Sequence, residues 1–227
     1  MYFMGLLFFY LMCCKNKLNF YIGNKLLIMN LVERVKNIIV TPKIEWLVID
    51  SESDTLQSVI MKYVLPLAAI GAICTFIGYG FIGLDTGVLG IRIKGLDWGL
   101  KMAIMALVMS VISVVVTTFV VDALAPSFGS EKNLNKSAQL VAYGYTPAFI
   151  GAFLTIFPAI STIGSLFGLY GFYLLYLGLG PLKKTPEDKK VVYLVVTVLV
   201  LIVVYFIIGM VLRPILGLNN MYSGLSV

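Results

Sequence analysis

The longest uncharged stretch of the chain runs from Ser137 to Leu182 and reads SAQLVAYGYTPAFIGAFLTIFPAISTIGSLFGLYGFYLLYLGLGPL. It is about twice as long as one bilayer crossing, which takes roughly 20 helical residues at ~1.5 Å each. A proline, Pro158, lies near its middle, and lysines flank both of its ends. We therefore predict a transmembrane helical hairpin with arms at residues 138–157 and 162–180 and a turn at residues 158–161.

The composition of the whole chain agrees with a membrane protein. Of its 227 residues, 60% are hydrophobic and only 12% are charged, whereas soluble domains carry about 25% charged residues. Three further uncharged spans cover residues 63–84, 102–121 and 191–212. We predict an all-α, polytopic membrane protein with five transmembrane helices and an N-terminal amphipathic cytosolic segment.

Several function classes are excluded by what the sequence lacks. The chain has no histidine, which excludes histidine-ligated zinc and Ser-His or Cys-His nucleophilic sites. Its net charge of +6 comes from lysines that flank apolar spans, which favours membrane lipids over nucleic acid as partners. Three carboxylates at residues 50–54 are interpreted as a solvated loop with a helix cap, with a cation site as the alternative. We predict no catalytic, metal or cofactor site.

The chain divides into four segments by composition. Residues 1–28 form an apolar run followed by lysines, which we interpret as a mis-called start, with a weak anchor and a cleaved signal as alternatives. Residues 29–62 form an amphipathic cytosolic or interfacial segment on the bilayer surface, where Trp46 suits the water interface. The alternative is a solvated helix that packs on the protein's own loops. Residues 63–212 hold the five spans, and residues 213–227 form a short tail outside the cytoplasm.

The first arm of the hairpin contains the motif Tyr143-Gly144-Tyr145-Thr146-Pro147. Proline removes one helix hydrogen bond and kinks the helix, while neighbouring hydroxyls can pair with the freed backbone groups. A break at membrane depth is also typical of binding sites. We keep both interpretations, a structural kink and a functional site.

Two further features could matter within the spans. Asp122 directly follows the second uncharged span, so it is a candidate intramembrane acid or a boundary residue. Gly164, Gly168 and Gly171 form a candidate packing face in the second arm, because small residues let helices approach closely. That face would pack within the molecule or against a second copy.

Lysine and arginine residues set the expected orientation. From residue 29 onward, most of them lie in segments that share one side of the membrane if the N-terminus is cytoplasmic. The positive-inside rule therefore predicts a cytoplasmic N-terminus and an exported C-terminus.

The chain resembles the Yip family of integral membrane proteins, named for interacting with Ypt/Rab GTPases, and is most similar to its bacterial branch. The resemblance lies in the five-span order, the stretch AYGYTP at residues 142–147, the stretch LYGFYLLYLG at residues 169–178, and the loop at residues 181–187. It implies a five-helix protein with a cytosolic N-terminal segment, and a role in vesicle traffic in the eukaryotic branch.

These features predict a non-enzymatic membrane protein of the Yip-like type in a bacterial cytoplasmic (inner) membrane. It would organise membrane lipids, another membrane protein or copies of itself. The alternative is a small transporter or channel component that uses the kinked third span.

Overall fold

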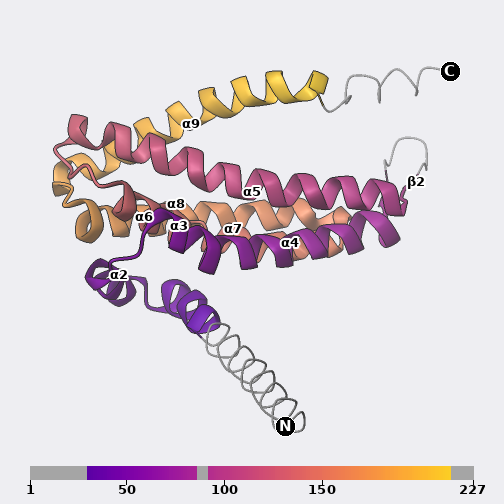
Figure 1. The fold of residues 1–227 in the computed structure, drawn as a ribbon, viewed down its shortest axis with the longest axis horizontal. Helices are drawn as coiled ribbons and strands as arrows, with labels where there is room; N and C mark the ends of the chain where they lie inside the picture. Colours follow the sequence, from indigo (N-terminus) through magenta and orange to yellow (C-terminus); the bar gives the residue numbers. More distant parts are fainter. Residues whose placement is uncertain (1–29, 86–91, 216–227) are drawn as a thin grey trace, which may run out of the picture.

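The computed structural model describes residues 30–85 and 92–215. The predictions made for residues 1–28, and for the tail from residue 216 onward, lie outside these described residues. Five helices in the described chain are long and apolar enough to cross a membrane, and they lie side by side as one bundle (Figure 1). The predicted all-helical, five-span fold is confirmed.

The amphipathic segment forms two short helices that precede the first span. Residues 30–40 are helical, and α2 follows at Pro42–Ser51 with its proline in the first turn. The chain bends at Thr41. Since proline has no backbone N–H and suits the start of a helix, Thr41-Pro42 ends one helix and opens the next.

The first span is one continuous helix from Leu56 to Ile82 with two wider π-helical turns. It consists of α3 (Leu56–Val59), η1 (Ile60–Val64), α4 (Leu65–Ile77) and η2 (Gly78–Ile82). The side chain of Thr55 accepts a hydrogen bond from the Ser58 amide and caps this helix. The span therefore begins seven residues earlier than the uncharged stretch alone predicts, and Lys62 lies inside it.

The second span follows a small antiparallel hairpin of β1 (Leu84–Asp85) and β2 (Arg92–Ile93). Helix α5 covers Leu96–Leu124, and η3 (Ala125–Phe128), with Pro126 in its first turn, follows it. The first two spans approach closely at Gly80 and Gly99. A Cβ atom added to Gly99 would lie 2.6 Å from the Gly80 Cα atom, so only a residue without a side chain fits there.

The uncharged stretch forms the predicted hairpin. Its first arm is α6 (Leu134–Gly144), α7 (Thr146–Gly151) and η4 (Ala152–Ile156). After the turn, η5 (Pro158–Ile160) leads into α8 (Ser161–Lys183). Helix α8 continues past Pro181, three residues beyond the predicted end, because a proline in the last turn removes only one hydrogen bond.

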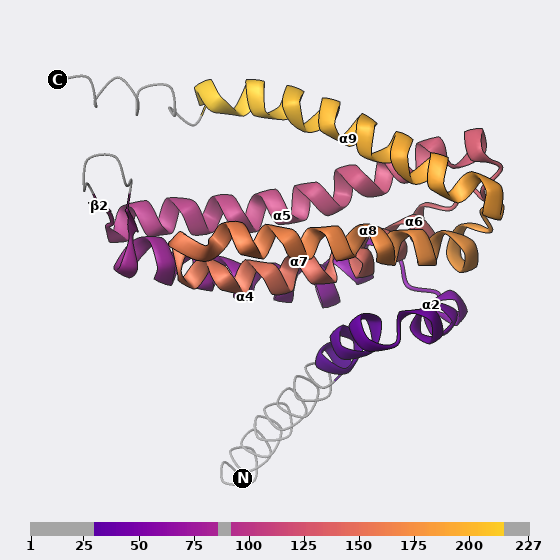
Figure 2. The same ribbon diagram turned by 180° about the vertical axis from the view of Figure 1, so that it is seen from behind.

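The fifth span, α9 (Glu187–Ile215), contacts both α8 and α5. It lies close to the bundle at its N-terminal end and diverges from it further along (Figure 2).

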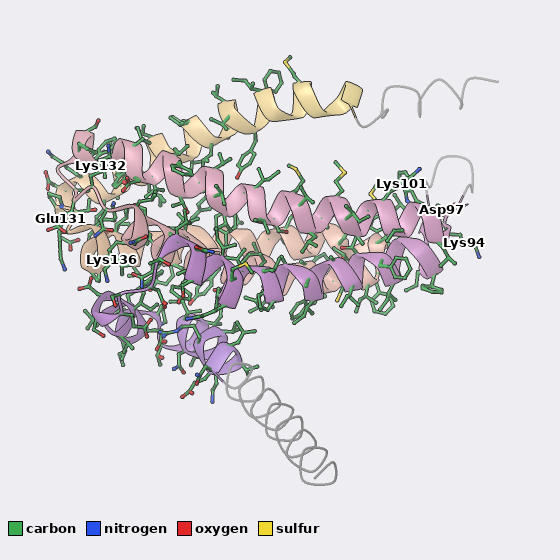
Figure 3. The ribbon with its side chains drawn as sticks, in the orientation of Figure 1. Lys94, Asp97, Lys101, Glu131, Lys132 and Lys136 are labelled. Atoms are coloured by element: carbon green, nitrogen blue, oxygen red, sulfur yellow. The ribbon has the colours of Figure 1, made fainter. Side chains whose placement is uncertain are left out.

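Charged side chains gather at the two ends of the bundle. One end carries Glu131, Lys132 and Lys136, and the opposite end carries Lys94, Asp97 and Lys101 (Figure 3). We call the first the polar end; it is formed by residues 30–55, 129–136 and 183–190. The helices between the two ends present large exposed apolar side chains, as a bilayer-embedded surface requires.

Candidate functional site

The helix break lies where the motif predicts it. Helix α6 ends at Gly144 and α7 begins at Thr146, with Pro147 in its first turn. The Thr146 hydroxyl donates to the Tyr143 carbonyl at 2.6 Å, which is the carbonyl that Pro147 leaves without its helical partner. The freed backbone group is thus paired inside the protein, as a membrane interior demands.

Two hydroxyl contacts tie the break to other spans. The Tyr63 hydroxyl lies 2.6 Å from the Thr146 hydroxyl, and since Thr146 gives its proton to Tyr143, Tyr63 is the donor. On the opposite side of the break, the Tyr145 hydroxyl lies 2.9 Å from that of Thr117 on α5. The break is therefore fixed between the first and second spans.

A cavity of about 310 Å³ lies beside the break, between α5, α6, α7, α8 and α9. We call it the α8–α9 cavity. Its lining is mostly apolar, and the lining residues that carry a hydroxyl are Thr117, Tyr145, Ser165 and Thr197. Each of these positions lies well inside its span, away from both ends. None of the described residues that line it is charged.

The three glycines of the second arm are placed differently. A Cβ atom on Gly164 would lie 2.4 Å from the Gly151 carbonyl oxygen, and one on Gly171 would lie 2.9 Å from that of Gly144. These two glycines lie where the arms of the hairpin touch. Gly168 faces the α8–α9 cavity instead, and a Cβ atom there would meet no atom of the described residues within 4 Å.

Asp122 lies at the polar end, where it forms a buried cluster with Ser137 and Lys183. Lys183 donates to Asp122 at 3.1 Å and to Ser137 at 2.7 Å, and Ser137 donates to Asp122 at 3.0 Å. The lysine side chain is 0% exposed and the aspartate 10%. The sequence identifies Lys183 only as a lysine that flanks the uncharged hairpin, so its pairing with Asp122 is not predicted. No local signal marks this pair, because 61 residues separate its members.

A second polar network holds the amphipathic segment against the bundle. Arg34 pairs with Glu45 and Glu52, and its guanidinium lies 5.4 Å from the centre of the Tyr143 ring. Burial lowers the pKa of Arg34, but the hydrogen bond to Glu52 and the nearby carboxylates outweigh it and raise the pKa overall. Arg34 therefore remains charged.

Lys136 strengthens the same junction from the third span. Its ammonium donates to the carbonyls of Asp50 and Glu52 at 2.5 and 3.0 Å. These carbonyls end α2, where a cation is favourable because of the helix dipole. Of the three carboxylates at residues 50–54, Asp50 pairs with Lys136 and Lys184, and Glu52 pairs with Arg34. Asp54 accepts a hydrogen bond from Ser58.

Trp46 differs from its predicted place at the water interface. Its side chain is fully buried and packs over Gly178 of α8, where a Cβ atom would come within 2.9 Å of the indole ring. The glycine leaves the space that the ring needs. Trp46 therefore docks α2 onto the bundle.

Comparison with known proteins gives a consistent family assignment. The sequence profile described as the Yip1 domain matches residues 36–209. The chain belongs to the Yip1 domain family. The match runs from the amphipathic segment through most of the fifth span, so the break, the α8–α9 cavity and the buried cluster all lie within the family domain.

Curated relatives agree with a membrane protein. The chain is 31% identical over 143 residues to the inner membrane protein YohC of Escherichia coli (strain K12), covering 61% of this chain and 72% of that protein. The same values hold for the inner membrane protein YohC of Escherichia coli O6:H1. No solved structure matches the chain.

Proposed function

We propose that this Yip1 domain protein is a non-enzymatic organiser of membrane lipids, and that it holds a phospholipid acyl chain in the α8–α9 cavity. The observation that carries the proposal is a mostly apolar cavity well inside the spans, beside a helix break. Acyl chains are the abundant apolar ligand at that depth. The few hydroxyls of the lining already pair with protein groups in part, as Tyr145 does with Thr117.

The cavity chemistry favours a lipid over an ion. Ions crossing a membrane need charged side chains or rows of carbonyls along their path, and the cavity lining that the structure describes contains no charged residue. A transporter would have to use the helix break and Asp122 together as its substrate path. Asp122 is instead engaged by Ser137 and Lys183 at the polar end, so it is occupied by structural partners.

The proposal also names the membrane in which the protein resides and its orientation there. We place the protein in a bacterial cytoplasmic membrane with the polar end and the N-terminus in the cytoplasm, which the excess of lysines at that end supports. Single cysteines at Lys132 and Asp97, which lie at opposite ends of the bundle (Figure 3), test the orientation. An impermeant thiol reagent added outside intact cells should label the cysteine at 97 and not the one at 132; the reverse labelling would contradict it.

A cavity-filling variant tests the lipid proposal. Gly168→Phe places a ring in the α8–α9 cavity, where the backbone has room for a Cβ atom. We expect native mass spectrometry of the purified protein to show fewer retained phospholipids than wild type. The matched control is Leu199→Phe, at a position 57% exposed on α9 and outside the cavity lining, which should retain the wild-type number.

The same experiment separates other occupants. A second copy or another protein in the cavity would appear as a complex that Gly168→Phe dissociates while the phospholipid count stays unchanged. That outcome would reject the lipid proposal in favour of a protein partner.

A further inference from the structure

A second cavity, of about 330 Å³, lies on the other side of the helix break, near the polar end. We call it the interfacial pocket. It is lined by Asn30, Leu31, Arg34, Asp54, Lys62, Tyr63 and Tyr143. Tyr143 thus faces this pocket while the next residue, Gly144, faces the α8–α9 cavity. The interfacial pocket differs from that cavity because charges of both signs line it.

Two of these charges are available to a ligand. Lys62 is exposed, and neither Lys62 nor Asp54 forms an ion pair with any residue that the structure describes. One carboxylate oxygen of Asp54 accepts from the Ser58 hydroxyl at 2.9 Å; the other has no hydrogen-bond partner among the described residues. The pocket therefore offers one free cation and one free acceptor of opposite charge.

Two of the other polar side chains that line the pocket already bind protein groups. Arg34 is engaged by Glu45 and Glu52, and the Tyr63 hydroxyl donates to Thr146. The Tyr143 hydroxyl makes no hydrogen bond to another described residue. Because two carboxylates already neutralise Arg34, its guanidinium is not free to bind an anionic ligand in the pocket.

The depth of the pocket suits a lipid headgroup. Lys62 lies two turns into the first span, and Asp54 lies just before that span begins. Residues there are at the level where headgroups meet hydrocarbon, and lysine side chains extend toward phosphates from such positions.

We propose that the interfacial pocket binds the phosphoethanolamine headgroup of a phospholipid, with the phosphate at Lys62 and the primary ammonium at Asp54. This inference rests on the proposed lipid-organising function and names the headgroup class. A primary ammonium donates hydrogen bonds to a carboxylate, whereas the quaternary ammonium of choline has no proton to donate. An anionic glycerol headgroup has no positive group for Asp54 and would be repelled by it.

The experiment equilibrates the full-length protein in detergent with an equimolar mixture of phosphatidylethanolamine, phosphatidylcholine and phosphatidylglycerol that share the same acyl chains. Bound lipids are then identified by native mass spectrometry. One charge-assisted hydrogen bond is worth about tenfold in affinity, so the ethanolamine lipid should exceed the choline lipid by about tenfold at the most retentive site.

Two variants test the ammonium contact and the phosphate contact separately. Asp54→Asn removes the ammonium partner and should bring the ethanolamine-to-choline ratio close to one. Lys62→Gln removes the phosphate partner and should lower the occupancy of both lipids at that site. Glu33→Gln and Lys36→Gln make the same charge changes at exposed positions outside the pocket and should leave the ratio unchanged. Thermal midpoints confirm that each variant is folded.

The outcomes separate this inference from the proposed function. Equal retention of the three lipids by wild type, a preference for the glycerol lipid, or an unchanged ratio in Asp54→Asn would overturn the headgroup assignment. In those cases the total number of bound phospholipids would still support lipid organisation through the α8–α9 cavity. Absence of any retained phospholipid would reject both.

Discussion

Replacing Lys183 with methionine would leave the Asp122 carboxylate buried with only the Ser137 hydroxyl as a partner. Methionine matches the length of lysine, so the packing of the 0% exposed side chain is largely kept and the change isolates the charge. Removing one partner of a buried ion pair costs about 3–5 kcal/mol. For a chain of this size that corresponds to a midpoint roughly 6–20 °C lower.

Thermal unfolding in detergent, followed by the loss of monodisperse protein, measures this shift. The neighbouring Lys184→Met is the matched control. Lys184 also pairs with a carboxylate, Asp50, at 3.1 Å, but its side chain is 53% exposed. An exposed pair contributes about 0–1 kcal/mol, so this variant should unfold within a few degrees of wild type.

The double variant Asp122→Asn/Lys183→Met completes the test. It removes the unpaired charge, and replacing both members of a buried pair by neutral groups is often close to neutral. We expect it to recover most of the stability that the single variant loses. A single variant as stable as wild type, or a double variant no better than the single, would refute the view that this pair is a buried, mutually dependent contact.

Further substitutions probe the break, the hairpin seam and the docked segment. Thr146→Val leaves a buried carbonyl unpaired and should cost about 1–3 kcal/mol in a thermal melt, whereas Pro147→Ala should be nearly neutral in stability because Thr146 already pairs with the freed carbonyl; a melt that ranks them the other way would contradict the assignment. Gly164→Leu should prevent the two hairpin arms from closing and abolish monodisperse protein on size exclusion, while Gly168→Leu should be tolerated; equal behaviour of the two would reject the placement of these glycines. Arg34→Gln should make residues 30–51 accessible to limited proteolysis in detergent micelles, and unchanged resistance would show that the Arg34 network does not hold this segment.

The local features of the fold could be predicted from the sequence. The hairpin, its turn at Pro158 and the helix break before Pro147 depend on an uncharged length and on prolines, which act within one or two turns of the chain. Each of these features lies where the sequence predicts it.

The features that escaped prediction depend on contacts between distant segments. Lys183 reads as a flanking charge until α8 is seen to continue beside Ser137 and Asp122. Trp46 reads as an interface anchor until Gly178 is seen to leave space for its ring. The interfacial pocket likewise joins residues from four segments, and no single stretch of sequence indicates it.

Cross-linking with a phospholipid that carries a photoactivatable diazirine in the middle of its acyl chain tests the central proposal most directly. If an acyl chain occupies the α8–α9 cavity, adducts should concentrate at residues 165–175 and 194–201, and Gly168→Phe should remove them while Leu199→Phe does not. Labelling spread evenly over all exposed apolar faces, or adducts at the cavity that persist in Gly168→Phe, would contradict the proposal.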